Sequence, residues 1–181
     1  MRDNKFRSFK VAFGGMIAAL SIVFMFSTGI VPTLTYAIPA ICGALLMTVV
    51  IEISPFFAGT IYVAVSFLSL LVVADKEAAV MYTAFFGYYP IIKSFIEKIQ
   101  KNTISWVIKY IIFNIAMVSS YLVASKLFMI TFDDIDFLGK FALPGLLLAG
   151  NVVFAIYDVA LTRLVTAYLM VWRKYVKRVF K

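Results

Sequence analysis

Long apolar stretches separated by short polar connections make up the pattern of this chain. A transmembrane helix needs about 20 mostly apolar residues, and six stretches approach or exceed that length. The expected spans are residues 11–31, 37–54, 56–74, 78–98, 104–128 and 141–172. Because the connections left over are short, the pattern predicts a single domain, a bundle of six transmembrane helices.

Composition supports the same class of protein. Of 181 residues, 64% are hydrophobic and 14% are charged, and the mean hydropathy is +1.00. A soluble domain of this size carries far more charge, so we expect an all-α integral membrane protein. The first span is too long for a signal peptide, and no small-x-small cleavage site follows it.

The fourth span differs from the others because polar and aromatic residues interrupt its apolar run. Five of them fall within about 80° of one another on a helix: Tyr82, Phe86, Tyr89, Lys93 and Glu97. Lys93 and Glu97 are four residues apart and can pair. Pro90 removes one backbone N–H and leaves the carbonyl of Phe86 without its helical partner. We interpret this stripe as the organising face of the bundle, with a packed proline kink as the simpler alternative.

Lysine and arginine residues gather on one side of a six-span arrangement. They concentrate in the N-terminal segment, around residues 93–101 and in the C-terminal tail, whereas the connection at residues 131–140 is acidic. The positive-inside rule therefore predicts that both termini are cytoplasmic. Trp106 and Trp172 then lie at the cytoplasmic interface, where indole rings are enriched.

This orientation places six charged residues in the cytoplasmic third of the bundle: Glu52, Lys93, Glu97, Lys109, Asp158 and Arg163. An unpaired charge at a helix centre costs on the order of 2.5–3.5 kcal/mol. Lys109 and Arg163 can extend toward the headgroups, but the short side chain of Asp158 cannot. We therefore predict a buried charge network in which Asp158 is ionised and pairs with Lys93 or Lys109.

Neutral polar side chains occupy the middle and outer layers of the third to sixth spans. The candidate substrate-binding residues are Tyr82, Tyr88, Tyr89, Asn114, Tyr121 and Asn151. Such groups line pockets for small ligands, and they also join helices through hydrogen bonds worth under about 2 kcal/mol each. Both interpretations stay open, and the first predicts a solute pocket that faces outward.

Several kinds of chemistry lack the residues they need. The chain has no histidine, and its single cysteine, Cys42, lies in an apolar segment. No Walker loop, zincin pattern or Gly-x-Ser-x-Gly elbow occurs. We therefore predict no catalytic residue, cofactor, metal or enzyme activity. The basic tail suits anionic membrane lipid better than nucleic acid.

The first span carries small residues at the spacing that lets helices approach closely in lipid. The two pairs are Gly14 with Ala18 and Gly15 with Ala19. We predict that these residues dock on a partner; packing inside the bundle fits the spacing equally well.

Six spans, about 180 residues, cytoplasmic ends and a basic first helix with Gly/Ala pairs resemble the S components of energy-coupling factor (ECF) transporters. In that family a small membrane protein binds a vitamin or related micronutrient near its outer face. It then docks on a membrane coupling subunit that carries two ATPases. The resemblance implies that Gly15 and Ala19, or Gly14 and Ala18, match the family's Ala-xxx-Ala docking motif with glycine in place of one alanine, and that residues 27–39 form a lid. No vitamin-specific signature accompanies this layout.

Three functions follow from these observations. The first is a solute-binding S component, which hydrolyses no ATP itself. The second is a structural membrane protein of an envelope or cell-shape complex, whose polar residues only join helices. The third is a proton-coupled carrier in which Asp158 and Glu52 or Glu97 exchange protons. The two halves of the chain show no repeat that would support a carrier.

Overall fold

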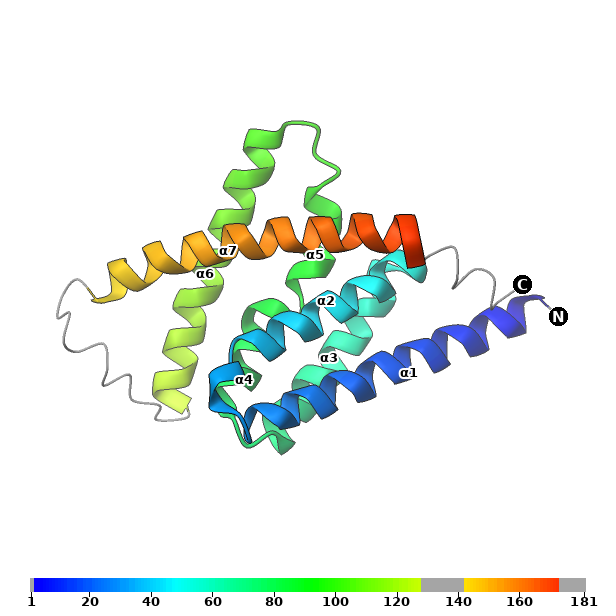
Figure 1. Cartoon of the computed structure of the whole chain (residues 1–181), viewed down its shortest axis with the longest axis horizontal. Coiled ribbons are helices and arrows are strands. Elements are labelled where there is room, and N and C mark those ends of the chain that lie inside the picture. The colour runs from blue at the N-terminus through cyan, green and yellow to red at the C-terminus, as the bar shows by residue number, and fades with distance from the viewer. Residues whose placement is uncertain (1, 128–141, 173–181) are drawn as a thin grey trace.

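The computed structural model describes residues 2–127 and 142–172, which form helices joined by short turns (Figure 1). The α-helices are α1 (Arg2–Thr28), α2 (Ala37–Glu52), α3 (Pro55–Val72), α4 (Lys76–Met81), α5 (Tyr89–Ile96), α6 (Asn102–Leu127) and α7 (Ala142–Ala167). The shorter elements are a 3-10 turn and two π-helical segments: η1 (Pro32–Leu34), η2 (Tyr82–Phe86) and η4 (Tyr168–Trp172). The predicted all-α fold class is confirmed for the described residues.

Four helical stretches are long and apolar enough to cross a bilayer: Arg7–Thr28, Pro55–Val72, Asn102–Val123 and Leu147–Val171. Helix α2 is apolar but has only 16 residues. Large apolar side chains cover the outside of these helices, among them Val11, Phe56, Phe67, Leu148 and Ile156. Soluble proteins rarely expose so much contiguous apolar surface, so the fold is compatible with a membrane protein.

Local capping signals start two of the helices. The Ser54 side chain accepts a hydrogen bond from the backbone N–H of Phe57 at 3.2 Å, and Pro55 is the first residue of α3. Asp75 does the same for α4, accepting from the backbone N–H of Ala78 at 3.0 Å. Both caps satisfy N–H groups that have no partner within the helix.

The fourth predicted span, residues 78–98, is not one helix. After α4 the chain widens into η2, where the N–H of Gly87 donates to the carbonyl of Tyr82 at 2.8 Å. The helix then breaks, and α5 restarts with Pro90 in its first turn. Proline is tolerated there because the N–H it lacks has no helical partner. The simpler alternative, a proline kink within one continuous helix, is wrong: Pro90 lies in the first turn of a new helix.

Two glycines allow the neighbouring helices α2 and α3 to pack closely against this break. A Cβ on Gly43 of α2 would lie 2.3 Å from the carbonyl oxygen of Phe86. A Cβ on Gly87 would lie 2.6 Å from the ring of Tyr62 on α3. Any larger residue at either position would push the break away from α2 or α3, because protein interiors are close-packed. The break is therefore packed into the centre of the molecule.

The core has two parts. The first joins α1, α2 and α3 through aliphatic side chains and Cys42, and it continues into α4. The second is mainly aromatic and joins η2 and α5 to α6 and α7; its members include Phe85, Tyr89, Phe113 and Phe154. Helix α7 runs across α6 at a steep angle instead of lying beside it (Figure 1). The aromatic part fills this crossing.

The two small-residue pairs of α1 face different surroundings. Gly14 packs on α3, where an added Cβ would lie 2.7 Å from the ring of Phe57, and Ala18 packs against the first core. A Cβ on Gly15 would meet no described atom within 4 Å, and Ala19 is exposed. The Gly14/Ala18 pair therefore serves packing within the bundle. Docking through Gly15 and Ala19 stays a prediction.

Candidate functional site

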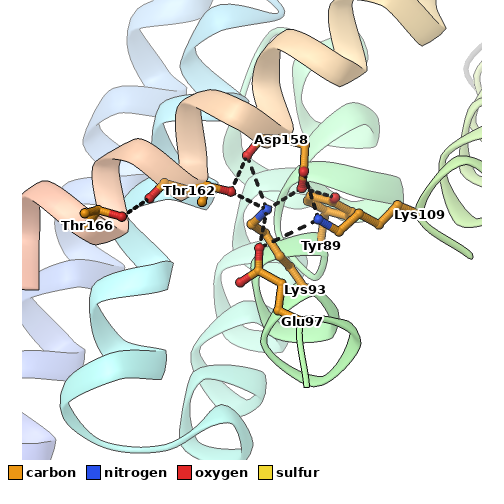
Figure 2. A network of polar contacts seen from close by, with 7 residues as sticks. All are labelled: Tyr89, Lys93, Glu97, Lys109, Asp158, Thr162 and Thr166. Atoms are coloured by element: carbon orange, nitrogen blue, oxygen red, sulfur yellow. Dashed lines mark hydrogen bonds and ion pairs between the residues drawn. The ribbon is translucent and has the colours of Figure 1, made fainter. Parts of the chain in front are cut away.

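Charged residues of α5, α6 and α7 meet in one buried charge cluster, formed by Lys93, Glu97, Lys109 and Asp158 (Figure 2). Nζ of Lys93 contacts Oδ1 of Asp158, and Nζ of Lys109 lies 2.8 Å from Oδ2. The exposed fraction is 0% for Lys93 and 2% for Asp158. The predicted contact of Asp158 with a lysine is confirmed, and both candidate lysines take part.

Neutral groups complete the coordination of this ion pair. The hydroxyl of Tyr89 donates to Oδ1 of Asp158 at 2.6 Å. Lys93 also donates to Oγ1 of Thr162 at 2.9 Å and to the carbonyl oxygen of Asp158 at 3.2 Å. A buried charge is tolerated when it is paired and its remaining hydrogen-bonding positions are filled. These contacts explain how α7 keeps an aspartate in the interior.

Glu97 completes the cluster at its solvent-facing edge. Its Oε1 lies 2.8 Å from Nζ of Lys93 and 3.7 Å from Nζ of Lys109, and its side chain is 39% exposed. The predicted pair of Lys93 and Glu97 is confirmed. With all four groups ionised, the two lysines balance the two carboxylates, so the cluster carries no net charge.

A polar cavity of about 420 Å³ opens onto the charge cluster beside the α5–α6 connection. Its lining includes Asn102, Ser105, Trp106, Lys109, Asp158 and Arg163. Nζ of Lys109 lies 5.2 Å from the centroid of the Trp106 ring, within the range of a cation–π contact. The polar cavity therefore leads from solvent to both Lys109 and Asp158.

Two of the six predicted charges lie outside the four ion pairs of the cluster. Arg163 is exposed on α7 and lines the polar cavity. It follows Asp158 by five residues, which turns it about 140° around the helix. Glu52 is half-buried at the end of α2. The ion pairs of the cluster join four of the six predicted charges, and the membership of Glu52 and Arg163 in the network stays a prediction.

A second cavity, the apolar pocket, has a volume of about 410 Å³ and lies between η2, α6 and α7. Its walls are aromatic and aliphatic side chains, among them Phe85, Phe86, Phe113, Met117, Phe154 and Tyr157. The polar lining residues are few, and they include Tyr36 and Glu77 near the start of α2 and α4. A mostly apolar pocket with a few polar groups is the usual form of a small-molecule site.

An aromatic wall, formed by Phe85, Tyr89, Phe113 and Phe154, separates this pocket from the charge cluster. The ring of Tyr89 lies 4.8 Å from that of Phe85 and 5.4 Å from that of Phe154, centroid to centroid. Phe113 and Phe154 stack at 4.7 Å. Because the hydroxyl of Tyr89 also holds Asp158, this residue belongs to both the wall and the cluster.

Among the six candidate substrate-binding residues, Tyr121 lines the apolar pocket. Asn114 and Asn151 instead bond to each other across α6 and α7, with N–O distances of 2.9 and 3.1 Å. Each also donates to a carbonyl one turn back in its own helix. This reciprocal pair has the geometry expected of a contact that joins two helices.

The three candidate tyrosines of the fourth span lie apart from the apolar pocket. Tyr89 is in the charge cluster, and Tyr82 is fully buried against the first core. Tyr88 packs edge-on against Tyr62 of α3 with the ring centroids 6.1 Å apart. Sequence reasoning missed the phenylalanines and methionines that line the pocket, because apolar residues carry little signal in an apolar chain.

The connection before α2 is held at the rim of the apolar pocket by two carboxylates. The hydroxyl of Tyr36 donates to Oε1 of Glu77, and Oγ1 of Thr35 donates to Oδ2 of Asp75 at 2.8 Å. Partial burial is the main cause that raises the pKa of Tyr36 above its usual range, and the hydrogen bond to Glu77 raises this pKa further. Tyr36 therefore remains a neutral hydrogen-bond donor to a charged acceptor.

Neither a metal site nor a relative identifies the chemistry. Within residues 2–127 and 142–172, no group of three or more His, Cys, Asp or Glu side chains could hold a metal ion. Comparisons with protein-family models, with curated proteins and with solved structures find no match to this chain. The function is therefore argued from the charge cluster and the two cavities.

Proposed function

We propose that this protein is a solute-binding membrane subunit that takes a small apolar molecule into the pocket between η2, α6 and α7. The observation that carries the proposal is the apolar pocket itself, about 410 Å³ in volume, with aromatic walls and few polar groups. Pockets of this size and character bind small molecules. The charge cluster lies behind the aromatic wall, where it can stabilise the helices without contacting the solute.

In this proposal the chain crosses the membrane six times, with both termini in the cytoplasm. The one-sided distribution of lysine and arginine supports that orientation. The apolar pocket then lies in the outer half of the bundle, beside the connection that carries Tyr36. The polar cavity then faces the cytoplasm.

Uptake of the solute requires a partner that supplies energy. We assign this role to a coupling module bearing ATPases, as in the ECF transporters that the chain resembles, with a vitamin or similar micronutrient as the solute. Gly15 and Ala19 support the assignment because both lie on the outside of α1, where another helix could approach closely.

Cysteine accessibility in intact cells tests the orientation of the two cavities. In a Cys42→Ala background, Tyr121→Cys places a thiol at the apolar pocket and Asn102→Cys places one at the polar cavity. A membrane-impermeant maleimide should label Tyr121→Cys from outside and label Asn102→Cys only after permeabilisation. Labelling of Asn102→Cys in intact cells would overturn the proposed orientation.

Native mass spectrometry of the purified protein tests solute binding. Ala149 lines the apolar pocket, so Ala149→Trp should fill the pocket and remove a bound small molecule. Ala160→Trp is the matched control, because Ala160 is exposed on the same helix. Equal occupancy in the two variants, or a phospholipid as the bound mass, would overturn the proposal.

A structural membrane protein is the second candidate. The reciprocal contact of Asn114 with Asn151 favours it, as does the internal charge balance of the cluster. In that function the polar residues only join helices. It predicts that the protein purifies without a bound solute and that Ala149→Trp changes no binding property.

A further inference from the structure

We infer that the solute is a cation: an apolar or aromatic molecule with a positively charged head, such as an amine, that pairs with Glu77 at the rim of the apolar pocket. The inference rests on the proposed function of this pocket and adds the chemical class of the solute. It is carried by the charges at the rim, by the surroundings of Glu77 and by the chemistry of the walls.

The charge at the rim has one sign. Glu77 is the charged residue of the pocket lining, and no lysine or arginine lines the pocket within the described residues. Asp75, which is bonded to Thr35 and caps α4, adds a second carboxylate close by. The neighbouring cation, Lys76, is directed elsewhere, because its Nζ donates to the carbonyl of Leu70 at 2.9 Å. The rim therefore attracts a positive charge.

The Glu77 carboxylate is held in place and retains capacity to bind. Its Oε1 accepts the hydroxyl of Tyr36, while a carboxylate offers about four acceptor positions on its two oxygens. Tyr36 is thus a positioning residue that orients Glu77 at the rim. An ammonium group can donate to the carboxylate without displacing Tyr36.

The walls fit the rest of such a molecule. Rings of Phe85, Phe113 and Phe154 line the pocket and contact one another. They offer apolar area to an aliphatic or aromatic body, and their faces attract a cation that enters deeper. An anionic solute would meet the Glu77 carboxylate at the rim, with Asp75 close by, and no compensating cation in the described lining. The pocket therefore discriminates by charge at its rim and by apolarity within.

Calorimetry with two probes of matched shape tests the inference on the full chain in lipid nanodiscs. The probes are 2-(1-naphthyl)ethylamine, which is protonated at pH 7, and its neutral counterpart 2-(1-naphthyl)ethanol. We expect the wild type to bind the amine at least about fivefold more tightly than the alcohol, the ratio for a modest ion pair of about 1 kcal/mol. Glu77→Gln should remove this preference, so that the two probes bind with equal affinity.

Matched variants test whether the preference for the amine depends on the negative charge of Glu77 or on negative charge elsewhere in the protein. Glu97→Gln neutralises another partly exposed glutamate, at the polar cavity, and should preserve the preference for the amine. Tyr36→Phe should weaken the preference only in part, because Glu77 keeps its charge. Equal affinities for the two probes in the wild type, or a preference that survives Glu77→Gln, would overturn the inference.

Failure of the proposed function gives a different result. If neither probe binds the wild type, or if Ala149→Trp leaves binding of both probes unchanged, the apolar pocket is not a solute site. Both proposals then fail. A third result would separate the two proposals. If both probes bind with equal affinity and Ala149→Trp abolishes their binding, the apolar pocket is a solute site, and only the inference that the solute is a cation is rejected.

Discussion

The two cavities have nearly the same volume, about 420 and 410 Å³, and both are lined by α6 and α7, but their chemistry is opposite. At the polar cavity, Lys109 and Asp158 pair with each other, and Lys93 pairs with Asp158 in the interior behind them. In the apolar pocket, the lining is mainly aromatic and aliphatic side chains. Buried charges are tolerated when they are paired and hydrogen-bonded, whereas a mostly apolar cavity with a few polar groups is the usual form of a small-molecule site. The comparison suggests a structural role for the first cavity and a binding role for the second.

Tyr89 connects the two regions. Its ring packs in the aromatic wall, while its hydroxyl holds Asp158. A change in the cluster can therefore reach the pocket through one side chain. The following experiments test how far the two regions are independent, from the largest expected effect to the smallest.

Asp158→Asn should have the largest effect, because it leaves the buried Lys93 and Lys109 with only the partly exposed Glu97 as an acidic partner. Removing one partner of a buried ion pair costs about 3–5 kcal/mol, and unfolding in mixed micelles would measure the loss. Lys93→Met should cost less, since Lys109 still pairs with Asp158. Glu97→Gln should cost under about 1 kcal/mol, because Glu97 is 39% exposed.

The double variant Asp158→Asn with Lys93→Met measures the coupling directly. The double variant should recover part of the stability that Asp158→Asn loses. It should not recover all of it, because Lys109 still lacks the Asp158 carboxylate. Strictly additive losses would show that Lys93 and Asp158 do not interact. If Glu97→Gln lowered stability as much as Asp158→Asn, the expectation that an ion pair contributes less near solvent than in the buried interior would be wrong.

Gly43→Ala should have the next largest effect. The new Cβ would lie 2.3 Å from the carbonyl oxygen of Phe86, and overpacking of this kind costs about 1–3 kcal/mol. Gly59→Ala is the control, because a Cβ on Gly59 meets no described atom within 4 Å. That control should stabilise α3 by about 0.5–1 kcal/mol. If Gly43→Ala and Gly59→Ala changed the thermal unfolding temperature equally, close approach of α2 would not be needed at the break between η2 and α5.

The amide pair between α6 and α7 should give a smaller effect than Gly43→Ala. Asn114→Ala and Asn151→Ala should each cost roughly 0.6–1.7 kcal/mol, the range for hydrogen bonds between membrane helices. Their double variant should show a positive coupling, since the two amides bond to each other. Binding of the naphthyl probes should not change. A loss of probe affinity without a loss of stability would show that these two residues belong to the binding site.

Sequence reasoning succeeds where one local rule decides the outcome. Counting apolar residues is enough to predict an all-helical chain, because a helix in lipid must satisfy its backbone hydrogen bonds within itself, but it does not predict the break within residues 78–98. Asp158 is too short to reach solvent from its position, so its pairing with a lysine follows from the cost of an isolated buried charge. The pair of Lys93 and Glu97 follows in the same way from their spacing of four residues.

Tertiary structure alone decided the rest, for reasons that no local rule contains. Pro90 could kink a helix or begin one, and the close packing of Gly43 and Gly87 on their neighbours accompanies the second outcome. Arg163 lies at the right depth for the cluster, yet it is exposed at the polar cavity while Asp158 is buried, because the rotation of α7 is set by its packing on α2 and α6. The apolar pocket arises where α6 and α7 cross, and its phenylalanines look like any others in a chain that is 64% hydrophobic. Composition determines what the helices are made of; the angle at which they cross determines where a cavity is left between them.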